Sequence, residues 1–206
     1  MTSMANLLYL VHRLPYPPNK GDKVRSYHLL QHLRRRHRVF LGTFVDDPGD
    51  ESHLPAVRML CDELCSITLH PHANRLRSLS GLAQGLPLTI SYYDHPRMRA
   101  WVRQTIVSRD IDAIVVFSSG MAQYAAEHDG LALLVDLVDV DSAKWTEYSR
   151  SRAWPFSWLY RREGDRLLDY EKRVAERADR TVLVSRREVE LFETLAPECA
   201  GTVKPL

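Results

Sequence analysis

Short apolar runs alternate along the chain with longer stretches in which apolar and charged residues recur at helical spacing. The apolar runs predict six β-strands, and several, such as "AIVVF" and "ALLVDLV", are apolar almost without a break. Such runs are typical of strands buried on both faces of a parallel sheet. The predicted strands are Asn6–His12, Arg38–Val45, Leu64–Leu69, Asp112–Ser118, Ala132–Val138 and Arg180–Ser185.

Helical spacing predicts helices between and after these strands. They are Lys23–Arg36, His53–Glu63, Leu76–Gln84, Pro96–Ser108, Met121–His128, Asp141–Arg152, Leu159–Ala178 and Arg187–Leu195. The alternation favours an α/β fold, a Rossmann-like three-layer α/β/α arrangement with a mostly parallel sheet. Asp46–Glu51 is predicted as a surface loop, and Gly85–Pro96 as an irregular connection with room for one short strand.

Composition places the chain among ordinary globular proteins. It has 206 residues, of which 45% are apolar and 26% charged, and its net charge is +2. Three cysteines argue against a disulfide framework and for a reducing compartment. No apolar run approaches the roughly 18 residues that span a bilayer, and the N-terminus lacks the features of a signal peptide. We therefore expect a cytoplasmic protein.

The loop "YPPNKGDKVRS" after the first predicted strand is the first candidate site. Ligands of parallel α/β sheets bind outside the carboxyl ends of the strands, and the N-terminus of a helix attracts phosphate. Gly21 allows a close approach of the backbone, Lys20, Lys23 and Arg25 add positive charge, and Asp22 lies at the helix start. The spacing is neither G-x-G-x-x-G nor a Walker A motif. The alternative is a solvated loop in which Asp22 only caps the helix.

Two further strand ends carry polar residues. "DLVDVDSAKW" brings together Asp139, Asp141, Ser142 and Lys144. One of the two carboxylates would bind or orient a substrate hydroxyl, making this pair the catalytic candidate; the alternative is that Asp141 or Ser142 caps a helix.

The stretch "SSG", Ser118, Ser119 and Gly120, lies at the end of the fourth predicted strand and would touch a bound substrate, or form only a capping turn. Hydrolase chemistry is rejected because the segment lacks a G-x-S-x-G elbow. Cys61, Cys65, His70 and His72 do not match a structural zinc spacing, so no metal site is predicted.

The segment "SRSRAWPFSWLYRR", residues 149–162, mixes aromatic residues with arginines. Such a mixture suits a membrane interface or a lipid-linked acceptor, and the alternative is that the aromatic rings pack inward. "RRRHR", Arg34–Arg38, needs no function beyond stabilising a helix C-terminus. No nucleic-acid recognition module is present, so nucleic acid is not an expected partner.

Two stretches carry a resemblance to a known family. "PYPPNKGDKVRSYHLLQHL" resembles the first loop and helix of retaining GT-B glycosyltransferases of family 4, and "YEKRVAERADRTVLVSRREVELF", Tyr170–Phe192, is similar to the end of their N-terminal domain. "LVDVDSAKW" is similar to the sugar transferases of bacterial exosortase and exopolysaccharide systems. One departure is the single Gly21, where the family often has a glycine pair.

The resemblance implies that residues 1–206 form the N-terminal, acceptor-side Rossmann-like domain of a GT-B enzyme, with the C-terminal donor-binding domain outside this chain. The full protein would move a sugar from a nucleotide-sugar donor to a glycan or lipid-linked acceptor in polysaccharide biosynthesis, with retained configuration and no cofactor. Lys20, Gly21, Asp22 and Arg25 would meet the donor phosphates. Asp139 or Asp141 would orient the acceptor hydroxyl, and the acceptor side of the cleft would also include Ser118, Ser119, Gly120, Ser142 and Lys144.

This half alone would be inactive, and peripheral contact with the inner membrane stays open. The alternative is a non-enzymatic α/β regulatory or membrane-surface binding module.

Overall fold

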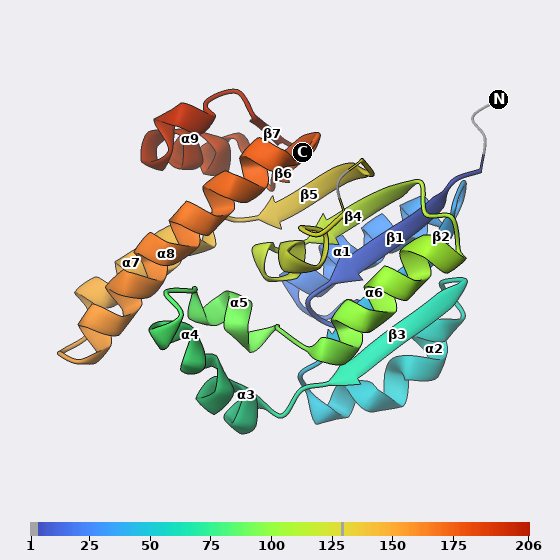
Figure 1. Ribbon diagram of the computed structural model, residues 1–206, viewed down its shortest axis with the longest axis horizontal. Helices are drawn as coiled ribbons and strands as arrows, with labels where there is room; N and C mark the ends of the chain where they lie inside the picture. Colours follow the sequence, from blue (N-terminus) through green and yellow to red (C-terminus); the bar gives the residue numbers. More distant parts are fainter. Residues whose placement is uncertain (1–3, 129) are drawn as a thin grey trace.

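The computed structural model describes residues 4–128 and 130–206, and its described part contains one parallel β-sheet. The strand order is β3-β2-β1-β4-β5-β6-β7, and each neighbouring pair is parallel (Figure 1). The bounds are β1 Asn6–Val11, β2 Arg38–Val45, β3 Glu63–Thr68, β4 Ala113–Phe117, β5 Ala132–Val138, β6 Arg180–Leu183 and β7 Val203–Pro205. All six predicted strands are confirmed, and the terminal stretch "GTVKPL" supplies the seventh.

Both α-helices and 3-10 helices connect the strands. The α-helices are α1 Gly21–Leu33, α2 Leu54–Arg58, α3 Pro71–Ser78, α4 Ser80–Ala83, α5 Leu88–Tyr92, α6 Pro96–Ser108, α7 Asp141–Arg150, α8 Phe156–Arg177 and α9 Arg186–Leu195. The 3-10 helices are η1 Pro48–His53, η2 Ser119–Tyr124 and η3 Pro197–Cys199.

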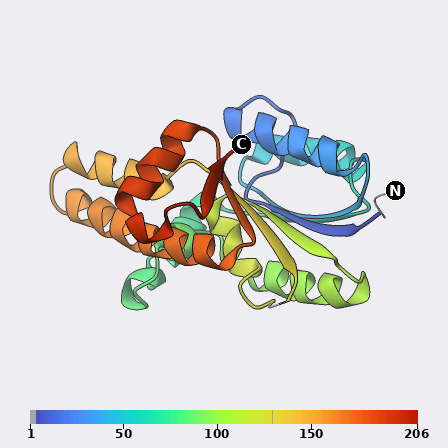
Figure 2. The same cartoon turned by 90° about the horizontal axis from the view of Figure 1, so that it is seen from above.

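Two apolar clusters lie on opposite faces of the sheet, because successive strand residues point to opposite sides. On one face Tyr9 and Leu41 pack with Leu30 of α1. On the other, Leu10 and Met98 belong to a larger cluster that includes residues of α6, α8 and α9. Figure 2 shows α1 and α6 on opposite sides of the sheet. The predicted three-layer α/β/α fold is confirmed.

Some connections differ from their predictions. The stretch predicted as a surface loop, Asp46–Glu51, enters η1, where Asp50 is buried against Lys23 with Nζ–Oδ2 at 2.5 Å. The predicted helix Met121–His128 is instead the 3-10 helix η2, and Leu76–Gln84 is divided between α3 and α4. The Lys23–Asp50 pair joins residues 27 positions apart, a contact that local spacing does not reveal.

The connection Gly85–Pro96 contains the helix α5 rather than a short strand. The carboxylate of Glu163, from α8, accepts hydrogen bonds from the Leu88 and Thr89 backbone N–H groups at 2.6 and 2.8 Å. A buried carboxylate at this helix N-terminus satisfies donors that would otherwise lack partners. A contact from a residue 75 positions away therefore fixes this helix.

Helices α7 and α8 form a hairpin, the α7–α8 arm (residues 141–177), that extends beyond the sheet (Figure 1). Gly164 lets the two helices approach closely. A Cβ atom there would lie 2.4 Å from Thr146 Oγ1 and 3.0 Å from the Ser142 carbonyl oxygen. The arm therefore has a fixed packing at its base.

Candidate functional site

The carboxyl ends of the parallel strands meet at one edge of the sheet, which we call the carboxyl rim. The residues that follow β1, β2, β4 and β5 begin at His12, Asp46, Ser118 and Asp139, respectively. The expectation that the predicted strand ends share one edge is thus confirmed. What each side chain does there differs from residue to residue.

The N-terminus of α1 is open at the rim. The helix begins at Gly21, its N-cap residue Lys20 makes no capping bond with its side chain, and Asp22 Oδ1 accepts the Lys23 backbone N–H at 3.0 Å. A Cβ on Gly21 would meet nothing within 4 Å, so the backbone is accessible from this side. The Lys20 side chain is exposed, and its Nζ lies 4.0 Å from Asp47 Oδ2. Phosphate binding here stays a prediction, with an accessible helix N-terminus and an adjacent ammonium to support it.

Asp22 is engaged by two residues that follow β1, His12 and Arg13. Its Oδ2 lies 3.6 Å from His12 Nε2 and 3.3 Å from Arg13 Nη1. Hydrogen bonding from His12, with attraction to His12 and Arg13, outweighs burial and holds the pKa of Asp22 far below its ordinary value. Asp22 is therefore ionised and held by its neighbours His12 and Arg13, rather than free to face donor phosphates.

His12 was not among the predicted site residues. Its ring stacks on Phe117 with a centroid distance of 5.9 Å and meets Tyr93 edge-on at 5.8 Å. Its Nδ1 is buried without a hydrogen-bond partner in the described structure. The signal available in the sequence was its place as the last residue of the first apolar run, "NLLYLVH".

Two predicted cations of the first loop are already paired. Arg25 donates from Nε and Nη2 to both carboxylate oxygens of Asp136, at 2.7 and 3.1 Å. Lys23 is buried against Asp50, as described above. The prediction that they lend positive charge to a phosphate site is corrected: each neutralises a buried carboxylate, because an unpaired charge there would be costly.

Ser118, Ser119 and Gly120 are buried rather than exposed on an acceptor surface. A Cβ on Gly120 would lie 2.7 Å from Tyr93 Cδ2, so the Tyr93 ring covers this turn. The Ser119 Oγ is buried with no hydrogen-bond partner among the described residues. Ser118 has a φ of +79°, a conformation that non-glycine residues rarely adopt. The turn lies beneath the Tyr93 ring. The prediction that this turn touches a substrate directly is therefore corrected.

Asp139, Asp141 and Lys144 form a partly exposed cluster at the end of β5. Lys144 Nζ lies 2.7 Å from Asp139 Oδ2 and 3.1 Å from Asp141 Oδ1. Burial lowers the pKa of Lys144, but its bonds to the two carboxylates outweigh that effect and hold the pKa above its ordinary value. The preceding Val138 has a φ of +71°, which is strained for a β-branched residue. The structure thus brings these three predicted residues together.

Ser142 does not belong to that cluster. It is buried, and its Oγ donates to Glu171 Oε2 at 2.6 Å. Burial raises the pKa of Glu171 to about 8, although hydrogen bonds from Ser142 oppose this. The predicted acceptor role of Ser142 is therefore corrected to packing between α7 and α8.

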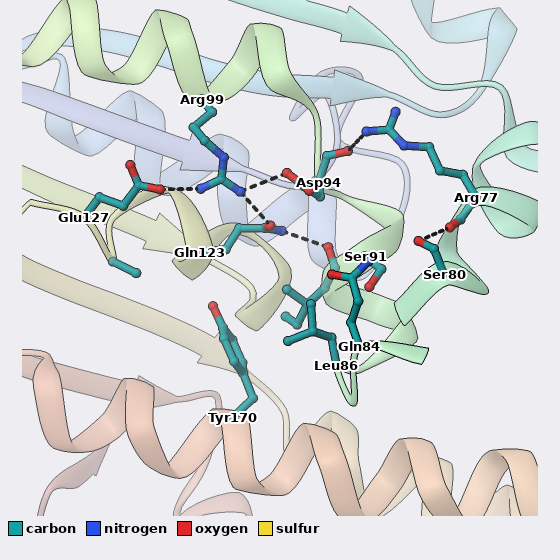
Figure 3. A pocket seen from close by; sticks show the side chains of 12 residues that line it. Arg77, Ser80, Gln84, Leu86, Ser91, Asp94, Arg99, Gln123, Glu127 and Tyr170 are labelled. Atoms are coloured by element: carbon teal, nitrogen blue, oxygen red, sulfur yellow. Dashed lines mark hydrogen bonds and ion pairs between the residues drawn. The ribbon is translucent and has the colours of Figure 1, made fainter. Parts of the chain in front are cut away.

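A cavity of about 310 Å³ lies away from these residues, between α5, α6, η2 and α8 (Figure 3). Arg99 joins Asp94 and Glu127 there, each at 2.9 Å, and Tyr170 reaches from α8 toward Gln123 (Figure 3). None of the predicted site residues lines this cavity. Its acidic groups pair with Arg99, whereas its second arginine, Arg77, donates to the Asp94 backbone carbonyl at 3.1 Å.

Cys61 and Cys65 are free and partly buried. Burial raises the pKa of the Cys61 and Cys65 thiols to about 11, so both are neutral at physiological pH. Within residues 4–128 and 130–206, no group of three His, Cys, Asp or Glu side chains is placed to hold a metal ion. The same part of the chain has no helix that is both long and apolar enough to cross a membrane.

Comparisons with known proteins bear on the fold. No protein-family model matches the chain, and no curated protein matches it significantly. Phytolacca americana UGT2, solved in complex with UDP-2fluoro-glucose and pterostilbene, matches with a TM-score of 0.51 and 10% identity, over 98% of this chain and 54% of UGT2. A Listeria monocytogenes protein provisionally described as a UDP-N-acetylglucosamine 2-epimerase matches with a TM-score of 0.48 and 9% identity, over 98% and 44%.

The chain thus spans about half the length of the solved structures it matches. At these identities the likeness concerns the fold alone. The chain has a GT-B-like, Rossmann-type fold.

Proposed function

We propose that this chain is the acceptor-side domain of a family 4 type GT-B glycosyltransferase. The full enzyme transfers a sugar from a nucleotide-sugar donor to a glycan or lipid-linked acceptor, with retained configuration, in bacterial polysaccharide biosynthesis of the exosortase-associated kind. Most donor contacts come from a second, C-terminal domain outside residues 1–206. This chain supplies one wall of the cleft between them and is inactive alone.

One juxtaposition carries the proposal. The open N-terminus of α1 at Gly21 and the cluster of Asp139, Asp141 and Lys144 lie on the same rim, at the ends of β1 and β5 with β4 between them. The first offers backbone N–H groups and the Lys20 ammonium to an anion; the second offers carboxylates to a hydroxyl. Sugar transfer from a nucleoside diphosphate needs both, because a diphosphate leaves while a hydroxyl attacks.

The residues divide the chemistry between them. Amides of Gly21 and Asp22, with Lys20, stabilise charge on the leaving diphosphate. Asp139 or Asp141 accepts a hydrogen bond from the acceptor hydroxyl and orients it, while Lys144 donates hydrogen bonds to both carboxylates and holds them in place. Arg25 acts indirectly, since its pairing with Asp136 fixes α1 against β5.

Transfer assays on the full-length protein, which contains this chain, test the proposal. A panel of nucleotide sugars with glycan and lipid-linked acceptors should reveal one donor that supports turnover, and residues 1–206 alone should give none. Turnover by the isolated chain would refute the proposal that a second domain supplies most of the donor contacts. The absence of transfer from any nucleotide sugar would favour the alternative of a non-enzymatic α/β module.

A further inference from the structure

The far end of the α7–α8 arm exposes three aromatic side chains. Trp154, Phe156 and Trp158, which we call the aromatic tip, are 80%, 57% and 56% exposed. They lie at the turn between α7 and α8, the part of the arm farthest from the sheet in both views (Figures 1 and 2). Large aromatic side chains gathered at one projecting point mark an interaction surface rather than part of the core.

Other aromatic residues support the tip from within the arm. The ring centroids of Trp145 and Tyr160 lie 5.2 Å apart, and those of Phe156 and Tyr160 lie 6.4 Å apart. Arg162 donates to the carbonyl oxygen of Leu86 at 3.2 Å, which ties α8 to the segment before α5. The tip is thus carried by two packed helices.

The charge next to the tip along the chain is positive, although Asp165 and Asp169 of α8 line the same hollow as Trp158. Residues 148–162 contain four arginines and no acidic residue. Arg150, Arg152 and Arg161 are exposed, and in the described part of the chain no ion pair involves them. The tip therefore presents a compact apolar point surrounded by unpaired guanidinium groups.

We infer that the arm docks this tip on the surface of an anionic lipid bilayer. Tryptophan rings prefer the boundary between headgroups and acyl chains, and nearby arginines bind lipid phosphates. A second copy of the chain fits less well, because two such tips would bring arginines against arginines. Three side chains also fall far short of the roughly 1,200 Å² that a stable protein interface buries.

The docking places the carboxyl rim at a set distance from the membrane. Helix α7 starts at Asp141, on the rim, and its 10 residues lead to the tip. At about 1.5 Å per residue, the helix spans roughly 15 Å. Resting on the proposed function, this geometry favours a lipid-linked acceptor over a free glycan. The docking itself does not depend on sugar transfer, so vesicle binding and transferase activity can fail independently.

Flotation with lipid vesicles tests the inference on the 206-residue chain. We expect binding to phosphatidylcholine vesicles that contain phosphatidylglycerol, weaker binding to pure phosphatidylcholine, and loss at high salt. The triple variant Trp154→Ala, Phe156→Ala, Trp158→Ala should bind at least tenfold more weakly. A matched control replaces three exposed apolar residues elsewhere, Met59, Leu76 and Val107, by alanine and should bind like the parent.

Charge variants and fluorescence separate the contributions of the arginines and of the tryptophans to vesicle binding. Arg150→Gln, Arg152→Gln, Arg161→Gln should lose about fivefold affinity for each arginine, whereas glutamines at Arg34, Arg35 and Arg36 should change little.

Brominated lipids should quench tryptophan fluorescence. The Trp154→Phe, Trp158→Phe variant should float normally yet lose most of this quenching, because Trp101 and Trp145 stay off the bilayer. Circular dichroism melts verify that each variant folds.

The inference is overturned if the parent does not float with anionic vesicles at low salt, or if the aromatic variant floats as well as its control. It is also overturned if light scattering shows a dimer that the aromatic variant dissociates while vesicles remain unbound. In that case the tip serves a second copy of the chain.

Discussion

Arg25 and Asp136 form a bidentate ion pair that joins the first helix to the fifth strand. The two hydrogen bonds measure 2.7 and 3.1 Å, and Asp136 is only 1% exposed. Asp136 Oδ1 also accepts the backbone N–H of Val138 at 3.0 Å, beside the strained residue that ends β5. The pair therefore links α1, whose N-terminus is open, to the strand end that carries the carboxylate cluster.

Removing Arg25 should destabilise the fold rather than only weaken a ligand site. In Arg25→Ala the Asp136 carboxylate stays buried without its partner, which we expect to cost about 3–5 kcal/mol of unfolding free energy. Urea denaturation measures the loss. The double variant Arg25→Ala, Asp136→Asn should recover part of it, and Arg35→Ala, an exposed arginine of the same region, should cost little. Equal stability of Arg25→Ala and its parent would show that the pair is dispensable.

The buried Glu171 should make the stability of the chain depend on pH. Its pKa is raised to about 8 in the folded state, above the ordinary value near 4.5. The folded protein therefore holds a proton that the unfolded chain releases, and stability should fall as pH rises from about 5 to about 8. The slope from this group is at most about 1.4 kcal/mol per pH unit.

Thermal melts across that pH range, made in parallel on the parent and Glu171→Gln, isolate the contribution of this carboxylate. The variant should show a flatter profile and gain stability relative to the parent at the alkaline end. A variant profile parallel to that of the parent would mean that Glu171 is not the group responsible.

The carboxylates at the end of β5 should matter for turnover and little for folding. In the full-length protein, Asp139→Asn should lower kcat by roughly 10²-fold if the carboxylate orients the acceptor hydroxyl. Its side chain is partly exposed and, among the residues that the structure describes, bonded only to Lys144, so the melting temperature of the variant should stay near that of the parent. Glu147→Gln, on the exposed side of α7, is the matched control. Wild-type kcat in Asp139→Asn and Asp141→Asn alike would remove this cluster from the mechanism.

The sequence predicted the sheet well because buried parallel strands leave a local signature. The runs "AIVVF" and "RVFLGTFV" became β4 and β2 with little or no change of bounds. Helix α5 was missed because its N-terminus depends on Glu163, from a helix far along the chain.

Contacts between residues far apart in the sequence also explain which predictions about the site failed. The sequence placed the candidate residues on one rim, since strand ends in a parallel sheet share an edge. It could not show that Arg25 would pair with Asp136, that Tyr93 would cover Gly120, or that Ser142 would turn toward Glu171. Each of these contacts joins residues from different elements, and tertiary packing alone decides which polar groups remain free.

The most direct test of the central claim is a heteronuclear NMR titration of the 206-residue chain with nucleotide sugars and their free nucleoside diphosphates. If the open N-terminus of α1 binds the diphosphate, the backbone amide signals of Gly21 and Asp22 should shift in a saturable way. The amides of Arg34–Arg36, at the other end of the helix, should remain still. Shifts confined to the cavity around Arg99, or no shift at Gly21 with millimolar ligand, would contradict the account.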